Sequence, residues 1–372
     1  MARTGVLPKQ TLRELCSRGY IEDVGEGFLN PASIDLPLSP EAYRLEREFL
    51  VLPGRTVRSL LSEVGATSHD LTHPLEVGVP YLIRIGGKWR LPDRVFGYAN
   101  PKSSIGRTFL LSRVLADNVP MYDALTGPGW AGELWVLVRP ERFPVLVSPS
   151  TPGTPGTPLS QVRLFDGTSF LDPLGMDMAI ENPGLLFNSD GVRLPKPHRH
   201  ADSMFLSVLV GDAMGWECRG TNCVLDLSMR SKNPASFFEP ISMRDGAFDL
   251  RKGSAYILAT AEHVMVPPEL SAELRTIDPR FGDFRAHLAG YIDPGWGWGE
   301  DGKGCGRPIT LEVMPHENLR LWPGQYVARV RYEHMKEPPD LPYDAASTSN
   351  YNVPGRARGP ALAKYFEAEH DE

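Results

Sequence analysis

The sequence predicts a mostly-β protein built from two domains of the same kind. Its 372 residues are enough for two domains of ordinary size, each with its own apolar core. The 36 glycines and 35 prolines lie among short β-branched and aromatic runs, and stretches with the 3.6-residue period of a long helix are few. Frequent turns between short strands favour an all-β fold with only a few short helices.

The first elements along the chain are a short helix and a half-buried strand. Residues 8–18 begin with proline, carry apolar residues three apart and precede a glycine, which predicts a helix. Within residues 30–38 apolar side chains alternate with Asp35, which predicts a strand entered through a turn. Further strands are expected at residues 75–85 and 94–99.

Residues 101–107, Pro-Lys-Ser-Ser-Ile-Gly-Arg, gather groups that suit an anion. Lys102 offers an ammonium, Ser103 and Ser104 two hydroxyls, and Arg107 a guanidinium, with backbone N–H groups able to face a ligand. We interpret the segment as a phosphate-binding loop. A serine-capped turn with solvated charges is the alternative, and it is the more frequent outcome for an isolated motif of this kind.

Residues 289–313 place two acids close together in the sequence. Asp293 opens a Pro-Gly turn that ends in Trp296. On the strand that follows, Thr310 and Glu312 face the side opposite to the apolar residues that alternate with them. We interpret the turn and the inward carboxylate as one wall of a pocket. The alternative is an ordinary strand with a solvated polar face.

An internal repeat divides the chain into two copies of one β unit. Four segments of the second half echo segments of the first half in the same order: 222–227 and 30–36, 250–258 and 75–83, 293–296 and 127–130, 323–332 and 158–165. We expect an N-terminal domain over residues 1–165, a linker over 166–200 and a C-terminal domain over 201–372.

The two copies differ where the chemistry is expected. Gly127 and Leu137 stand in the first copy at the places of Asp293 and Glu312, and the second copy lacks the Ser-Ser pair of the first. Each copy therefore holds half of a site, which favours a composite site over two unrelated solvated faces. The residues of this predicted site are Ser103, Arg107, Asp293 and Glu312.

With these motifs the chain resembles the dCTP deaminase family of the dUTPase-like superfamily, in its long, duplicated form. The matching segments are 31–36 (Pro-Ala-Ser-Ile-Asp-Leu), 102–107, 292–296, 309–313 and the Pro-Gly-Gln strand at Pro323. The resemblance implies two tandem distorted β-barrels of the jelly-roll kind, with sites between neighbouring barrels. We also expect a homo-oligomer.

The resemblance implies hydrolytic deamination of dCTP to dUTP and ammonia, a step of pyrimidine nucleotide metabolism. Glu312 would activate the water that attacks C4, Arg107 would orient Glu312 and the water, and Ser103 would join that network. Asp293 would accept the 3′-hydroxyl, and Trp296 would crowd out a 2′-hydroxyl. The residues expected to bind substrate are Lys102, Ser104, Asp293, Trp296, Thr310, Leu311, Tyr343 and Tyr351.

The cofactor expected from the resemblance is Mg2+, bound through the substrate triphosphate rather than to the attacking water. Zinc is not expected, because no PCxxC element with an upstream HxE is present. The net charge of −7 and the lack of a basic tract make a nucleic acid polymer an unexpected partner.

The expected compartment is the cytoplasm. The four cysteines do not form a disulfide framework or a CxxC pair, so free thiols in a reducing compartment are the simplest account. No apolar run is long enough to cross a bilayer, and no signal core follows Met1, so a membrane is not an expected partner.

Two rival functions remain open at this point. A dUTP diphosphatase, or a bifunctional enzyme that converts dCTP to dUMP, shares the Ile-Asp pair that includes Asp293, although Trp296 and Glu312 favour deamination. A non-catalytic nucleotide-binding regulator is suggested by Asn350 and Pro354, which depart from the family's C-terminal pattern. The insertion at residues 299–306 leaves the distance between the turn and the strand open.

Overall fold

The fold is all-β, as predicted. The computed structural model describes residues 4–151, 154–200, 202–209, 215–229, 232–285, 288–345 and 360–366. Within them, 27 strands accompany four α-helices, of which the longest have nine residues. No helix in this part of the chain has the length and apolar character needed to cross a membrane. The four cysteines all lie in it as thiols that form no disulfide.

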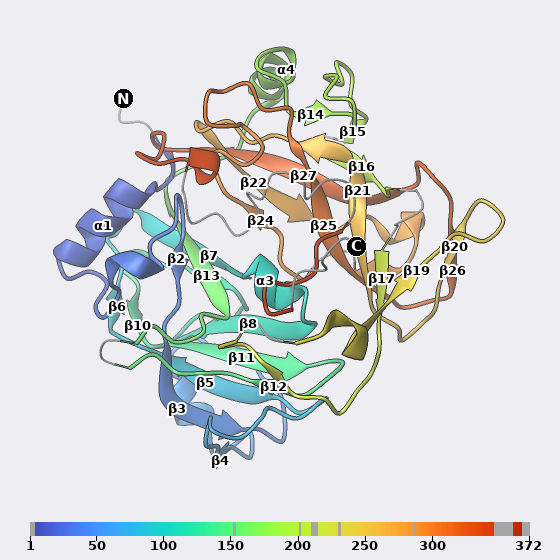
Figure 1. The fold of residues 1–372 in the computed structure, drawn as a ribbon. Helices are drawn as coiled ribbons and strands as arrows, with labels where there is room; N and C mark the ends of the chain where they lie inside the picture. Colours follow the sequence, from blue (N-terminus) through green and yellow to red (C-terminus); the bar gives the residue numbers. More distant parts are fainter. Residues whose placement is uncertain are drawn as a thin grey trace. The chain divides into compact units, whose positions relative to one another are not determined.

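The chain forms two compact units (Figure 1). We call them the N-terminal unit and the C-terminal unit. The first consists of Leu7–Gly167, Gly220–Phe237 and Ala363–Glu372, and the second of Met1–Val6, Thr168–Arg219 and Phe238–Leu362. The N-terminal unit therefore includes two segments from the second half of the sequence.

The N-terminal unit contains two main sheets. In one sheet, the strand order is β4-β3-β5-β11-β8. In the other sheet, β13 pairs with both β2 and β7, and β7 pairs with β9. The predicted first helix is present as α1. The elements are α1 (Lys9–Ser17), β2 (Ile34–Asp35), β3 (Leu38–Arg44), α2 (Val57–Leu60), β4 (Thr67–Ser68), β5 (Tyr81–Ile85), β6 (Trp89–Arg90), β7 (Val95–Pro101), α3 (Ser103–Gly106), β8 (Leu110–Ala116), β9 (Ala124–Leu125), β10 (Ala131–Gly132), β11 (Leu134–Pro140), β12 (Val145–Leu146), β13 (Ser160–Asp166) and β18 (Leu225–Asp226).

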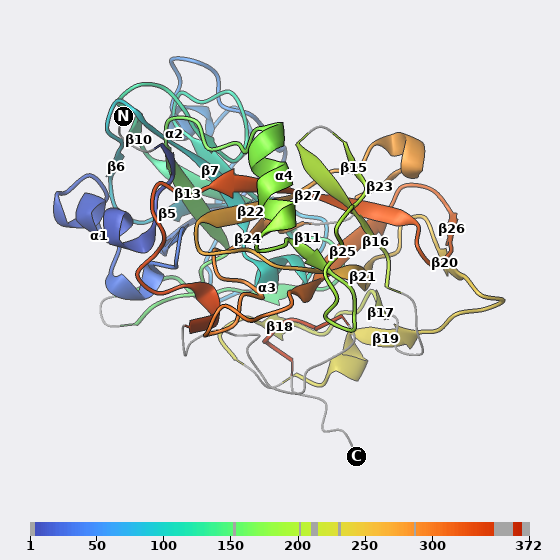
Figure 2. The same ribbon diagram turned by 90° about the horizontal axis from the view of Figure 1, so that it is seen from above.

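The C-terminal unit also contains two main sheets. Their strand orders are β19-β17-β21-β25-β23, with β14 added beside β21, and β15-β16-β27-β22-β24. Helix α4 lies over β22 and β27 in Figure 2, and its Met176 and Ile180 belong to the apolar core of this unit. The elements are β1 (Gly5–Val6), α4 (Pro173–Glu181), β14 (Leu186–Phe187), β15 (Arg199–His200), β16 (Ser203–Ser207), β17 (Gly215–Cys218), β19 (Phe238–Ile241), β20 (Phe248–Leu250), β21 (Tyr256–Val264), β22 (Leu270–Arg275), β23 (Phe284–Arg285), β24 (Tyr291–Ile292), β25 (Arg307–Pro315), β26 (Leu319–Leu321) and β27 (Tyr326–His334).

The repeat is visible in atomic detail at the start of β5 and β21. The hydroxyl of Tyr81 accepts the N–H of the residue five positions earlier at 3.2 Å, and that of Tyr256 does the same at 3.0 Å. Gly78 and Gly253 both have positive φ, +76° and +79°. Each donates its N–H to the last residue of the neighbouring strand, β11 or β25. These shared contacts confirm two copies of one β unit.

The strand registers fix which residues correspond. Tyr81 pairs with Val138, and Tyr256 pairs with Val313. One position further, Leu137 lies opposite Leu82 in β5, and Glu312 lies opposite Ile257 in β21. Leu137 is therefore the counterpart of Glu312, as the sequence predicted.

The predicted match between residues 222–227 and 30–36 is wrong. Strand β27 is the counterpart of β13. Strand β2 pairs with β13, and the strand in the same position beside β27 is β16, not β18. Strand β18 lies in the N-terminal unit and pairs in parallel with β12. Short alternating patterns recur in many strands, and they do not specify which strand is the neighbour.

Candidate active site

Glu312 lies on β25, an interior strand of the six-stranded sheet. The alternation predicted from the sequence is present, because Ile309, Leu311 and Val313 belong to the apolar core. Thr310 and Glu312 point to the other face, where Glu312 is only 1% exposed. The alternative of a solvated polar face is therefore wrong for this carboxylate.

The carboxylate of Glu312 is held by main-chain donors. Its Oε2 atom accepts the N–H of Leu288 at 3.0 Å and the N–H of Ala289 at 3.3 Å. A buried carboxylate is costly unless it accepts hydrogen bonds, and charge-assisted bonds from backbone N–H groups are strong. These bonds fix the position of the carboxyl group on the sheet.

The face of the sheet that carries Glu312 is partly covered by a segment near the C-terminus. Ile257 on β21 lies opposite Glu312 and next to Trp216 on β17. The indole N–H of Trp216 donates to the carbonyl of Pro360 at 3.4 Å. The N–H of Ala361 donates to the hydroxyl of Thr310 at 3.2 Å. Residues 360–361 thus span this face from β17 to β25.

The turn from Asp293 to Trp296 needs its glycine. Gly295 has φ +90°, and a Cβ atom there would lie 2.5 Å from the Cβ of Pro342. The N–H of Tyr343 donates to the carbonyl of Pro294 at 2.9 Å. The rings of Trp296 and Tyr343 are in contact, with centroids 5.3 Å apart. Two of the predicted substrate-binding residues therefore lie side by side, next to half-buried Asp293.

The glycine-rich insertion between the turn and β25 closes on itself. The N–H of Gly306 donates to the carbonyl of Gly297 at 3.0 Å, so the loop returns to where it began. The carbonyl of Trp296 accepts the N–H of Val266, and β25 pairs with β21 up to Val264. Both sides of the insertion are thus anchored to one short stretch of chain. The insertion does not separate the turn from the strand that carries Glu312.

Arg307 and Asp344 join this cluster, although sequence reasoning missed both. The guanidinium carbon of Arg307 lies 5.3 Å from the ring centroid of Trp296, and Arg307 pairs with Asp344 at 2.9 Å. Asp344 Oδ2 accepts the N–H of Gly299 at 3.0 Å. Burial raises the pKa of Asp344, and the positive charge of Arg307 acts in the opposite direction. The only sequence signal for these two residues is their position. Asp344 directly follows the predicted site residue Tyr343, and Arg307 directly follows the insertion at residues 299–306.

In the N-terminal unit, Lys102 is bound by a carboxylate of the protein. Its ammonium forms an ion pair with Asp35 Oδ2, and Asp35 Oδ1 accepts the side-chain N–H of Asn30 at 2.7 Å. Asp35, which alternates with apolar residues on the predicted strand, therefore holds the ammonium at the start of the predicted phosphate-binding loop.

The rest of that loop forms the short helix α3 and the residue after it. The hydroxyl of Ser104 lies 3.4 Å from the hydroxyl of Tyr365, and both residues are buried. Ser103 is half-buried, and its carbonyl accepts the N–H of Arg107, which is itself buried. The four donors of the motif therefore lie within one short segment, and the polar groups of Lys102 and Ser104 contact other parts of the protein.

The predicted site residues fall into two groups, one in each unit. The C-terminal unit contains Asp293, Trp296, Thr310, Leu311, Glu312 and Tyr343, and the N-terminal unit contains Lys102, Ser103, Ser104 and Arg107. The side chain of Leu311 is part of the apolar core, so any contact with a ligand would come from its main chain. Tyr351 lies outside the described residues, as do Asn350 and Pro354.

The repeated β unit defines a two-domain, all-β protein, which is consistent with the dUTPase-like fold that the resemblance implies. The family model for the N-terminal domain of 2′-deoxycytidine 5′-triphosphate deaminase matches residues 3–168. The family model for the C-terminal domain of that enzyme matches residues 191–366. The chain belongs to the dCTP deaminase family, in its long two-domain form, and is an enzyme of that family.

The structure resembles the crystal structure of 2′-deoxycytidine 5′-triphosphate deaminase from Agrobacterium tumefaciens. The TM-score is 0.81 and the sequences are 31% identical, over 91% of this chain and 97% of that one. Shorter matches link the chain to enzymes named "dCTP deaminase, dUMP-forming". The one from Methanothermobacter thermautotrophicus is 29% identical over 40% of this chain and 73% of its own length. The one from Methanobrevibacter smithii is 33% identical over 29% of this chain and 54% of its own length.

Proposed function

We propose that the protein hydrolyses dCTP to dUTP and ammonia, with Glu312 as the group that activates water. The observation that carries this proposal is the carboxylate of Glu312, buried on a sheet face and fixed by two backbone N–H groups. A carboxylate in a defined position is what general acid–base catalysis on a nucleobase requires. The names of the similar proteins support dCTP as the substrate.

The proposed reaction moves protons through one carboxyl group. Glu312 takes a proton from water as the oxygen bonds to C4 of cytosine, and it passes that proton to N3. It then takes the remaining proton from the C4 hydroxyl and gives it to the amino group, which leaves C4 as ammonia while the carbonyl forms. The products are a C4 carbonyl, which makes the base uracil, and one molecule of ammonia. The same residue thus serves as base and then as acid.

The remaining assignments are part of the same proposal and rest on the resemblance. Ser103 and Arg107 would act on the water and on Glu312, and Lys102 and Ser104 would hold the triphosphate. Asp293 would accept the 3′-hydroxyl of the sugar. The other residues proposed to bind the substrate are Trp296, which would crowd out a 2′-hydroxyl, and Thr310, Leu311, Tyr343 and Tyr351.

The substrate would bring Mg2+ with its triphosphate. Asp35, the carboxylate that contacts the predicted phosphate-binding loop, is engaged by Lys102 and Asn30, so we assign no protein ligand to the ion. Zinc is not part of the proposed reaction. A homo-oligomer stays a prediction, and so does the cytoplasm, which the four cysteine thiols support.

A second candidate is the bifunctional reaction from dCTP to dUMP and diphosphate. The names of the relatives from Methanothermobacter thermautotrophicus and Methanobrevibacter smithii favour it. Those matches cover 40% of this chain or less, whereas the Agrobacterium protein, titled only as a deaminase, matches 91% of it. The match over both domains supports deamination of dCTP, the step that the two candidates share.

The test is incubation of the purified protein with dCTP and Mg2+, followed by separation of dUTP from dUMP and measurement of ammonia. We expect dUTP and ammonia in equal amounts, and dUMP without dUTP would establish the bifunctional reaction instead. Glu312→Gln should bind dCTP and release no ammonia. The matched control is Glu300→Gln, which changes an exposed glutamate of the same unit. Tight dCTP binding without turnover by the unaltered protein would indicate a regulator.

A further inference from the structure

The pair formed by Arg307 and Asp344 connects three separate stretches of the C-terminal unit. Arg307 is the first residue of β25, and Asp344 belongs to the turn that also carries Tyr343. Asp344 accepts the N–H of Gly299, at the start of the glycine-rich loop. Its side chain is 3% exposed, whereas that of Arg307 is 27% exposed. The pair therefore anchors the loop and the Tyr343 turn to the strand that carries Glu312.

The ring of Trp296 is held between partners that belong to this assembly. Arg307 lies over the ring at 5.3 Å, and the ring of Tyr343 meets it at 5.3 Å with an interplanar angle of 50°. A guanidinium attracts the face of an indole ring, and a carboxylate that pairs with the guanidinium fixes its place. Asp344 thus acts on Trp296 through Arg307 and through its neighbour Tyr343.

The N-terminal unit shows that the tryptophan can be held without such a pair. Trp130, the counterpart of Trp296 in the repeat, donates its indole N–H to the carbonyl of Asp117 at 2.9 Å. It is followed directly by β10, without the glycine-rich loop. The unit with the catalytic carboxylate therefore has an additional arrangement for this ring.

We propose that Arg307 and Asp344 are positioning residues that set the place of the Trp296 ring and, through it, the preference for deoxyribose over ribose. The inference rests on the proposed function. Asp293, which would bind the 3′-hydroxyl, and Trp296 belong to one tight turn, so the ring would lie beside the sugar. A ring that moves away from that position would admit a 2′-hydroxyl.

The experiment measures kcat and KM for dCTP and for CTP in the full-length protein and in variants. Exclusion of an added hydroxyl by shape alone reaches about 100-fold, so we expect Arg307→Met to lower the dCTP preference about tenfold. The loss should come mainly from a lower KM for CTP. Asp344→Asn, which keeps an acceptor for Gly299, should lower the preference less. Arg280→Met is the matched control, because Arg280 forms an exposed pair with Asp278 in the same unit.

A second measurement separates positioning from a general loss of structure. In a Trp296→Ala background, Arg307→Met should change the preference no further, because its effect passes through the ring. If the unaltered protein deaminates dCTP and both single variants keep its sugar preference, the inference is overturned and the proposed function stands. If the unaltered protein releases no ammonia from dCTP, the proposed function itself fails. Should Arg307→Met not fold, Asp344→Asn and Arg307→Lys decide the matter alone.

Discussion

Strands β11 and β25 are counterparts, yet the faces that correspond to each other serve different purposes. Where β25 has Glu312, β11 has Leu137. Leu137 packs in an apolar cluster with Trp135 and with Val57 and Leu60 of α2. The face that carries a fixed carboxylate in the C-terminal unit is therefore a closed core in the N-terminal unit.

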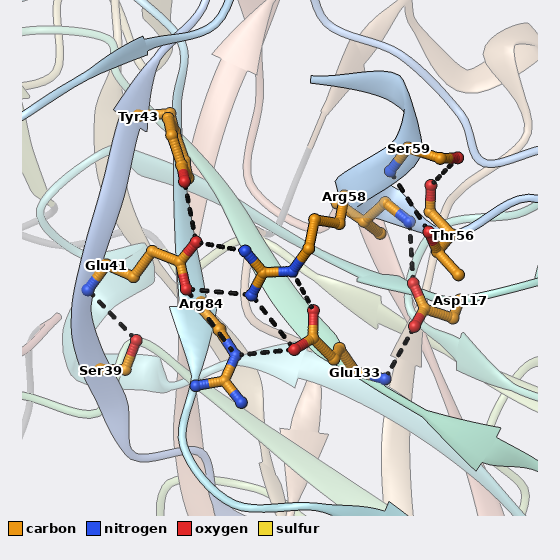
Figure 3. Close-up of polar contacts among 10 residues, drawn as sticks. Ser39, Glu41, Tyr43, Thr56, Arg58, Ser59, Arg84, Asp117 and Glu133 are labelled. Atoms are coloured by element: carbon orange, nitrogen blue, oxygen red, sulfur yellow. Dashed lines mark hydrogen bonds and ion pairs between the residues drawn. The ribbon is translucent and has the colours of Figure 1, made fainter. Parts of the chain in front are cut away.

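A charged network adds to the closure of the N-terminal unit. Figure 3 shows the guanidinium of Arg58 between the carboxylates of Glu41 and Glu133. Arg58 also lies 5.2 Å from the ring centroid of Trp135, and Arg84 donates to Glu133 at 3.1 Å. The hydrogen bonds that Glu41 accepts from Arg58 keep the pKa of the Glu41 carboxyl below its ordinary value.

The comparison shows that the shared strand pairing, β5 with β11 and β21 with β25, does not by itself specify a functional site. At the position of Arg84 the C-terminal unit has Ala259, and at the position of Trp135 it has Thr310. Large side chains fill the face in the N-terminal unit, whereas small or polar ones stand at the matching positions of the C-terminal unit. The same backbone thus supports an apolar core or a face that carries a buried carboxylate.

The largest expected effect comes from making the two faces alike. Glu312→Leu gives β25 the residue found on β11, and it should lower kcat for dCTP by about 100-fold to 10,000-fold, the range for loss of a general acid–base. The variant leaves the N–H groups of Leu288 and Ala289 without this acceptor, at a cost of about 1–3 kcal/mol for each buried group, so the fold is checked alongside turnover. Steady-state ammonia release and circular dichroism provide the two measurements. Retained turnover would remove Glu312 from the mechanism.

On the corresponding face of the N-terminal unit, Leu137→Ala should lower the stability of the fold rather than the turnover of dCTP. Removal of a buried leucine side chain beyond Cβ costs about 2–5 kcal/mol of unfolding free energy, depending on how far the cavity collapses. Urea unfolding measures the loss, and Leu137→Met, which keeps the volume, is the control. A loss of dCTP turnover at unchanged stability would contradict the assignment of this face as core.

A smaller effect tests the feature that the two units share. Tyr81→Phe and Tyr256→Phe each remove a hydroxyl that accepts a backbone N–H. Each should lower the unfolding free energy by about 0.5–1.5 kcal/mol, the net worth of an ordinary hydrogen bond. Tyr256 should cost more, because its hydroxyl also donates to Glu217 at 3.4 Å. Equal or reversed losses in urea unfolding would contradict this order.

The smallest expected effect concerns pH. The pKa of Asp344 is raised above its ordinary value of 3.8 by burial. The folded state therefore holds the proton more tightly, so the stability that this carboxyl contributes is present below pH 3.8 and is lost as pH rises through the folded-state pKa. The experiment compares the unfolding free energies of the unaltered protein and of Asp344→Asn. The value for the unaltered protein minus the value for the variant should fall as pH rises through that window. A difference that grows with pH would contradict this sign.

Much of the fold and part of the candidate site could be predicted from sequence patterns. Alternation around Glu312 identified the buried face of β25, and the Pro-Gly turn placed Trp296, because both features depend on neighbouring residues. The contact of Arg307 with Asp344 joins residues that are distant in sequence and lie at loop ends, where no periodic pattern marks a partner. The same limit explains the wrong match of residues 222–227, whose pairing is set by tertiary contacts.

The inclusion of Gly220–Phe237 in the N-terminal unit bears on how the protein can be divided in the laboratory. Phe237 packs on Phe143 at 4.9 Å and on Phe366 at 5.4 Å, so three distant parts of the sequence complete one aromatic cluster. A fragment that stops after Gly167 would expose Phe143 and leave β12 without its parallel neighbour. Expression of the first half alone should therefore yield an aggregation-prone product.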